Sequence, residues 1–182
     1  VPVQARGLRE QMDIFKNKHT WIMTYLYVIT FGTFSGLAAG FALLINNLYG
    51  TKAFGDAGID PVKYAFLGAL IGSAARIISG PIADRVGGGR MTVVATIGIS
   101  LASLYTCFQL SPTSADQFPQ FLYGMLTIFF FAGVGNASTF KQMPMIFERR
   151  QAGGVIGWTS AIAAYGPFIF GVMLAYISPL LF

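Results

Sequence analysis

Charged residues are scarce in this chain. Lysine, arginine, aspartate and glutamate together make up 10% of its 182 residues, whereas soluble domains carry ~25%. Hydrophobic residues reach 54% and gather in runs long enough to cross the ~30 Å core of a bilayer. This composition excludes a soluble globular domain and predicts an all-α integral membrane protein that contacts the lipid bilayer.

Cysteine and histidine are also nearly absent. Cys107 is the single cysteine and His19 the single histidine. One cysteine excludes an internal disulfide and a cysteine-only metal site. His19 precedes the first hydrophobic run, which excludes a bis-histidine haem inside the bundle and hence a respiratory haem anchor. The runs also lack the paired nucleophile and base of an intramembrane hydrolase, so we predict no enzymatic activity, no metal and no cofactor.

Five hydrophobic runs are long enough to span a membrane. They cover about Trp21–Leu44, Val62–Ala83, Met91–Leu110, Phe118–Phe140 with an extension toward Phe147, and Gly154–Ile177. We expect a kink in the last run near Pro167, because proline removes one helical hydrogen bond. Since the chain does not begin with methionine and stops directly after the fifth run, we also expect a fragment that lacks a sixth helix.

Basic residues are distributed unequally between the loops that join these runs. If the runs alternate in direction, the lead-in and the turns after the second and fourth runs share one side. That side carries Arg6, Arg9, Lys16, Lys18, Arg85, Arg90, Arg149 and Arg150. The other side carries only Lys52 and Lys63. The positive-inside rule places the first side in the cytoplasm, which explains the net charge of +5 without nucleic-acid binding.

Residues 1–18 form a polar lead-in to the first run, which we expect to be a cytoplasmic linker. Leu8, Met12 and Phe15 fall on one face of a short helix, and such a face suits a segment lying on the membrane surface. A disordered linker is the alternative. Residues 19–182 then form the transmembrane half-domain.

Arg76 interrupts the second hydrophobic run near its middle. An arginine at the centre of a span costs ~2.5–3.5 kcal/mol on insertion scales, so such a charge is tolerated where it faces a cavity and meets an anion. Gly68, Gly72, Arg76 and Gly80 are four positions apart and share one helical face. The three glycines allow a neighbouring helix to approach, or leave space around the guanidinium of Arg76. A structural arginine bound to backbone carbonyls is the alternative.

A glycine-rich polar turn follows this run. Asp84 lies at the C-terminal end of a helix, where the macrodipole disfavours an anion, so we expect its carboxylate to bind another part of the protein. The turn resembles the cytoplasmic loop motif of the major facilitator superfamily, G-x-x-x-D-R-x-G-x-x-R/K, which matches Gly80, Asp84, Arg85, Gly87 and Arg90. The resemblance implies that Asp84 faces the start of the fifth helix, near Gly153 and Gly154, and stabilises one gating state.

Longer stretches narrow the resemblance. Residues 19–41 resemble the seventh helix of the NarK-type nitrate/nitrite porters, residues 66–90 their eighth helix and loop, and residues 132–147 their tenth helix. The likeness covers most of residues 18–177. It implies a major facilitator superfamily fold in which this chain supplies about five transmembrane helices of the C-terminal six-helix bundle. The N-terminal half of the same transporter would then be its partner.

The same resemblance implies site residues. Arg76 would be one of two arginines that grip the anion, the second lying in the other half of the transporter. Tyr27 and Phe31 match positions that pack around the planar anion. Ser160 matches a polar position that faces the pathway.

Two further candidate pathway residues, Asn136 and Lys141, lie in the stretch that resembles the tenth helix. Lys141 is near the cytoplasmic end of its run. It would steer anions or snorkel to the interface, and we favour snorkelling.

The function implied by the resemblance is transport of nitrate and nitrite across a bacterial inner membrane by alternating access. Proton relays usually need acidic or histidine side chains within the spans, and the interior of the predicted spans has none. This observation favours nitrate/nitrite antiport. A nitrate/proton symporter and a porter for another small anion, such as an organic carboxylate, are the alternatives.

Overall fold

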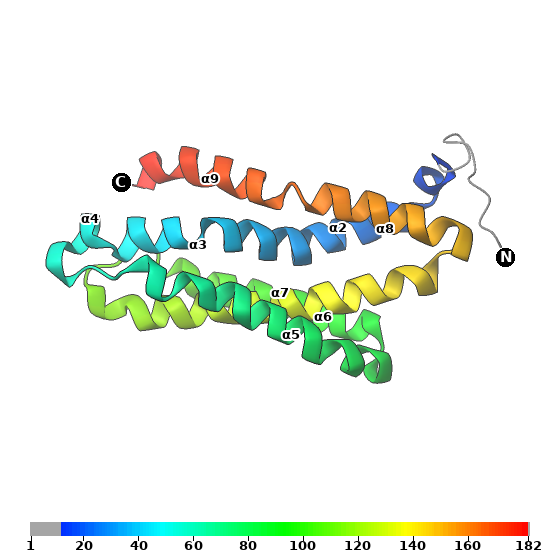
Figure 1. The fold of residues 1–182 in the computed structure, drawn as a ribbon, viewed down its shortest axis with the longest axis horizontal. Coiled ribbons are helices and arrows are strands. Elements are labelled where there is room, and N and C mark those ends of the chain that lie inside the picture. Colours follow the sequence, from blue (N-terminus) through cyan, green and yellow to red (C-terminus); the bar gives the residue numbers. More distant parts are fainter. Residues whose placement is uncertain (1–11, 182) are drawn as a thin grey trace.

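A computed structural model describes residues 12–181 of the chain, and Figure 1 shows that helices account for most of this range. Five helical stretches are long and apolar enough to cross a membrane, namely Lys18–Ala57, Pro61–Val86, Gly88–Cys107, Ala115–Ile146 and Arg149–Met173. No strand occurs within residues 12–181. The predicted all-α membrane architecture with five spans is therefore confirmed.

The first span consists of α2 (Lys18–Tyr27), a π-helical segment η2 (Val28–Gly32) and α3 (Thr33–Tyr49). Short helices α4 (Thr51–Phe54), η3 (Gly55–Ala57) and η4 (Pro61–Lys63) lead to α5 (Ala65–Val86) and α6 (Gly88–Cys107). The turn η5 (Ala115–Gln117) precedes α7 (Phe118–Ile146), and the fifth span consists of α8 (Arg149–Ala163) and α9 (Gly166–Leu181).

The spans form two layers (Figure 1). In one layer α2 packs on α8 and α3 on α9, so the first and fifth spans run side by side. In the other layer α7 packs against both α5 and α6, and it also contacts the first span. The largest core cluster joins the layers through aromatic side chains such as Phe41 and Phe129, whose ring centroids lie 5.3 Å apart. Thus α7 is the central helix of the bundle.

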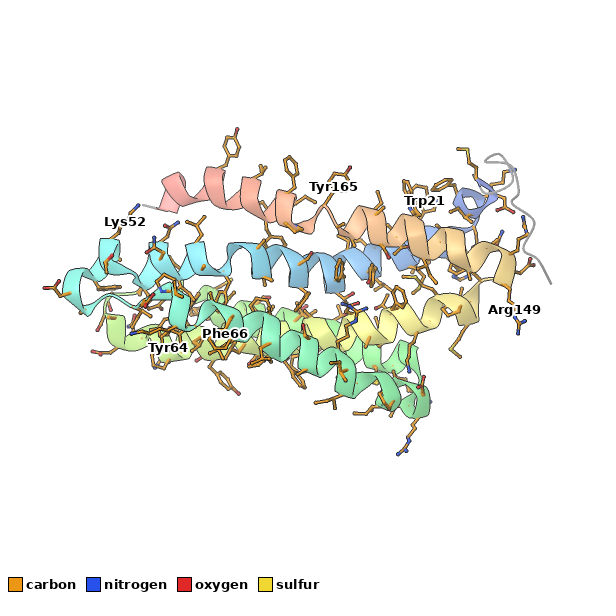
Figure 2. The ribbon with its side chains drawn as sticks, viewed as in Figure 1. Trp21, Lys52, Tyr64, Phe66, Arg149 and Tyr165 are labelled. Atoms are coloured by element: carbon orange, nitrogen blue, oxygen red, sulfur yellow. The ribbon has the colours of Figure 1, made fainter. Side chains whose placement is uncertain are left out.

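The ends of the spans alternate as the charge pattern predicted. Residues 12–18 of the lead-in, the turn between α5 and α6 and the turn between α7 and α8 lie at one end of the bundle (Figure 1). Trp21 and Arg149 lie at this end and Lys52 lies at the opposite end (Figure 2). The basic residues of residues 12–181 therefore gather at the end that the positive-inside rule assigns to the cytoplasm.

Two of the spans are interrupted at mid-length. The first span becomes π-helical over Val28–Gly32, a feature that hydropathy does not indicate. The fifth span breaks at 164–165, just before Pro167, so the expected kink is a full break. Pro167 is the second residue of the new helix, in the first turn, where its missing N–H leaves no helical hydrogen bond unmade. Tyr165, at the break, points away from the bundle (Figure 2).

The two interruptions face each other across the layer. A Cβ placed on Gly166 would lie 2.3 Å from the carbonyl oxygen of Gly32. This contact is between backbones, and any side chain on Gly166 would force the spans apart. The two irregular segments therefore meet at Gly32 and Gly166, where neither residue carries a side chain.

The end of the lead-in is docked onto the start of α8. The 3-10 helix η1 (Met12–Lys16) buries Ile14 against α8, and Asp13 forms an ion pair with Arg150. Desolvation opposes the charge of Asp13, but hydrogen bonds from Arg150 and Gln151 outweigh it and lower the pKa of Asp13. A disordered linker is therefore wrong for residues 12–16. Leu8 of the predicted membrane-surface helix lies outside the described residues.

Helices α5 and α7 approach closely through glycines. A Cβ on Gly133 would lie 2.1 Å from the carbonyl oxygen of Gly72, and one on Gly68 would overlap the ring of Phe129. Small residues allow such close approach between membrane helices, where van der Waals packing drives association. This contact fixes the register of α5 against α7.

Gly133→Ala tests this contact. The added methyl group has no space, so we expect the substitution to destabilise the folded protein by ~1–3 kcal/mol. Thermal unfolding in detergent micelles measures the effect. Gly157→Ala is the matched control, because a Cβ there has no neighbour within 4 Å and replacing a helical glycine by alanine is neutral or stabilising. Equal midpoints for Gly133→Ala and the unmodified protein would contradict the close contact.

Candidate functional site

Arg76 lies halfway along α5, at the edge of the helix face that packs against the bundle. The buried residues of α5 are Gly68, Gly72, Ala75, Ser79 and Ala83, whereas Arg76 is exposed in this chain. Gly68 and Gly72 lie under the rings of Phe129 and Phe34. The predicted stripe of small residues is therefore packed at its first two positions and turns toward the open face at Arg76.

The guanidinium of Arg76 is not neutralised within residues 12–181. The ion pairs in this part of the chain are Lys141–Asp84 and Arg150–Asp13, and both lie at one end of the bundle. An unpaired cation at mid-span is costly in hydrocarbon, so Arg76 is the candidate in this structure for binding an anion.

Tyr27 and Phe31 form the aromatic part of the site. Their rings stack with centroids 5.3 Å apart and an angle of 9° between the planes. Tyr27 is 3% exposed. Its phenol lies close to the side chain of Ser160 and within range of the charge of Arg76. The structure therefore brings Arg76 of α5, the stacked pair of the first span and Ser160 of α8 into one neighbourhood.

Asn136 lies in the middle of α7 and is 1% exposed. Neither its amide nitrogen nor its amide oxygen has a hydrogen-bond partner among the described residues. A buried polar group left without a partner costs ~1–3 kcal/mol. Sequence resemblance alone named Asn136, and nothing in its local sequence indicated that the amide would be buried without a partner.

The turn between α5 and α6 depends on one glycine with a positive φ. Gly87 has φ 95° and ends α5, a conformation that favours glycine because other residues carry a Cβ. Arg85 and Arg90 are exposed on either side of this turn.

Asp84 pairs with Lys141 of α7, whose ammonium also donates to the carbonyl oxygen of Gly80 at 2.8 Å. In this structure the partner of Asp84 is thus a lysine of α7, rather than the expected start of α8 near Gly153 and Gly154. Lys141 extends toward the end of its span, as a snorkelling lysine does, but its ammonium forms an ion pair with the Asp84 carboxylate. Because α7 packs directly against α5, this cation is near enough to satisfy the acid.

A polar network between α6 and α7 lies beside this ion pair. The hydroxyl of Thr92 hydrogen-bonds to Ser138 at 2.9 Å and accepts from the amide of Gln142 at 2.7 Å. Sequence reasoning missed this network, because single hydroxyl side chains in separate spans show no spacing that links them. It fixes the start of α6 against the α7 turn that carries Lys141.

Comparison with known proteins gives consistent relatives. No family model matches the chain. The chain is 61% identical over 176 residues to the probable nitrate/nitrite antiporter NarK2 of Thermus thermophilus. The aligned region covers 97% of this chain and 39% of that protein. It is 31% identical over 183 residues to the nitrate/nitrite transporter NarU of Escherichia coli, covering 89% and 38%. Identity to the nitrite extrusion protein of Bacillus subtilis is 28% over 168 residues, covering 90% and 38%.

The chain spans about two fifths of the length of these relatives. Within that length the similarity extends over nearly all of its residues, and the relatives are named for nitrate and nitrite. The five apolar helices agree with a multi-pass membrane protein. Over nearly all of its length the chain is therefore a homologue of the NarK-type nitrate/nitrite transporters, consistent with a fragment of such a transporter.

Proposed function

We propose that this chain forms one wall of the anion pathway in a nitrate/nitrite transporter that works by alternating access. The observation that carries the proposal is Arg76, a cation at mid-span without an ion-pair partner in residues 12–181. It lies within electrostatic range of Tyr27, which stacks on Phe31 and contacts Ser160. Intramembrane charges of this kind mark substrate pathways.

The side chains around Arg76 suit a planar oxyanion. A guanidinium is planar, stays charged, and offers paired N–H donors that match two oxygens of one anion. Nitrate and nitrite both present such oxygens in one plane. The aromatic pair supplies a flat apolar wall that keeps water from the faces of the anion, and Ser160 adds a hydroxyl at its edge.

The other wall of the pathway belongs to a second set of helices that faces Arg76. The relatives are about two and a half times as long as the aligned region, and Arg76 lies on an exposed face of this chain. We propose that the N-terminal half of the transporter covers this face and provides the second arginine. Two guanidinium groups repel each other when the site is empty, and a bound anion relieves that repulsion.

This repulsion supports exchange over proton symport. An empty transporter holds two unneutralised cations, so its change between inward- and outward-facing states is costly. The same change with nitrate or nitrite bound is not. The interiors of the described spans also contain no acidic or histidine side chain that could relay a proton. We therefore propose nitrate/nitrite antiport in a bacterial inner membrane, with the lead-in on the cytoplasmic side.

The ion pair Asp84–Lys141 is proposed as a gating contact. It joins the last turn of α5 to α7 at the proposed cytoplasmic end, where both side chains remain partly exposed to solvent. Exposed pairs contribute only ~0.2–1 kcal/mol, which is small enough to break and reform in each transport cycle. The motif residues Gly80, Arg85, Gly87 and Arg90 would shape the turn that carries Asp84.

Arg76→Lys tests the binding site. Lysine keeps the charge but loses the paired donors, and a hydrogen bond to a charged group is worth ~1.5–3 kcal/mol, so we expect nitrate affinity to fall about 10- to 100-fold. Nitrate titration of the purified transporter that contains this chain measures the loss. Arg149→Lys, an exposed cation at the start of α8, is the control. Unchanged affinity in Arg76→Lys would refute the site.

Counterflow in proteoliposomes tests exchange. Vesicles loaded with nitrite, nitrate or neither receive external labelled nitrate, with and without a pH gradient. We expect uptake that needs an internal anion and ignores the gradient, because the empty site does not reorient. Uptake into empty vesicles driven by the gradient would establish proton symport instead. Uptake of no nitrate under any condition would favour another small anion as substrate.

Asp84→Asn and Lys141→Met test the gating contact. Each removes the ion pair, so we expect slower counterflow with nitrate affinity retained. The double variant should be about as slow as either single variant, because all three lack the same interaction. Asp56→Asn, an exposed acid at the opposite end of the bundle, should exchange normally. Weakened affinity with normal turnover in Asp84→Asn would contradict the gating role.

A further inference from the structure

We infer that Asn136 is a substrate-binding residue whose amide donates a hydrogen bond to the transported anion, an inference that rests on the proposed transport function. Asn136 is 1% exposed, and both polar atoms of its amide are unpartnered among the described residues. Buried amides nearly always have a hydrogen-bond partner. An amide that the described helices leave unpaired is therefore suited to hydrogen-bond a ligand that binds transiently.

The packing of α5 on α7 places Asn136 at the depth of Arg76. Gly68 lies beside Phe129, Gly72 beside Gly133 and Gly80 beside Lys141, with a constant spacing of 61 positions. A constant spacing means that the two helices run parallel in a fixed register. In this register Arg76 lies level with residue 137, one position from Asn136.

The packing of α7 on the first span places Asn136 opposite the π-helical segment. Phe129 contacts Phe34, with ring centroids 6.0 Å apart, and Phe140 contacts Tyr27 at 5.9 Å. Asn136 shares the helix face of Phe129 and Phe140, being seven residues after one and four before the other. The antiparallel register thus sets it against Val28–Gly32.

The π-helical segment itself points to function. Single π-helical turns inside α-helices are rare and frequently lie at functional sites. This one begins directly after Tyr27 and includes Phe31, so it holds one member of the stacked aromatic pair and adjoins the other. The charge of Arg76 acts on Tyr27. Asn136 therefore lies behind the aromatic pair, at the level of the cation, where a movement of the segment would open the amide to the anion.

The chemistry of the amide complements that of Arg76. The Nδ2 group donates to an anion oxygen, and Oδ1 accepts from one of the five N–H groups of a guanidinium. Because the amide is uncharged and does not titrate, it adds a donor without adding to the repulsion between cations. Its preferred ligand is a small planar oxyanion that offers one oxygen to Asn136 and others to Arg76.

Asn136→Leu separates this role from a structural one. The leucine side chain is similar in size and removes a buried unpaired amide, so the anion-free protein should unfold at the same or a higher temperature. If Asn136 binds the anion, the nitrate dissociation constant should nevertheless rise about tenfold or more. A purely structural role predicts that stability and affinity change in the same direction.

The experiment titrates nitrate, and then nitrite, into the purified transporter that contains this chain and follows both dissociation constants and the unfolding midpoint. Asn136→Ser retains a donor and should recover part of the affinity that Asn136→Ala loses, which decides the question if the leucine variant fails to fold. Thr139→Val is the control. Thr139 is buried on the same helix and faces Thr92. The nitrate affinity of the Thr139→Val variant should therefore stay within about twofold of the unmodified value.

Affinity within about twofold of the unmodified transporter in Asn136→Leu, or equal affinities in Asn136→Ser and Asn136→Ala, would overturn the inference. A failure of the proposed function has a different signature, because the unmodified transporter would then show no nitrate binding at all. That result would overturn both proposals together.

Discussion

The cost of placing one arginine in hydrocarbon is the constraint on which this structure depends. Arg76 lies at mid-span with no ion-pair partner in residues 12–181, and the one acid of its own helix, Asp84, pairs with Lys141 instead. The guanidinium lies at the edge of the packed face of α5, where its charge acts on Tyr27. A membrane protein retains such a charge where an anion or a further domain meets it. Packing and proposed function therefore follow from the same residue.

The rest of the fold brings irregular backbone and polar side chains to the same depth. Glycine contacts between α5 and α7 fix their register and set Asn136 level with Arg76. The π-helical segment lies opposite Asn136, and its last residue, Gly32, meets Gly166 at the break between α8 and α9. Irregular backbone is tolerated inside a membrane where protein buries it. The three features form one region at mid-span, while the ion pair Asp84–Lys141 lies a few turns away, at the end of the bundle where the basic residues gather.

The sequence left several outcomes undetermined where they depended on a neighbouring helix. Lys141 forms an ion pair with Asp84 because α7 packs against α5. The sequence of α7 alone does not reveal this packing. Residues 12–16 are docked because Ile14 and Asp13 find partners on α8, more than a hundred residues later. The first span contains a π-helical segment that its hydropathy did not predict. Roles for Arg76, Tyr27, Phe31 and Ser160 stay predictions, although the structure brings these residues together.

The sequence by itself determined the number of spans, the end that carries the basic residues, the turn motif around Asp84 and the presence of a charge at mid-span. These features follow from hydropathy and charge, which are properties of each stretch taken alone. Only the tertiary structure decided which residues share a depth, which cation pairs with Asp84, and that the amide of Asn136 is buried without a partner. Those outcomes depend on the register between helices, which is set by side-chain packing between residues far apart in the chain.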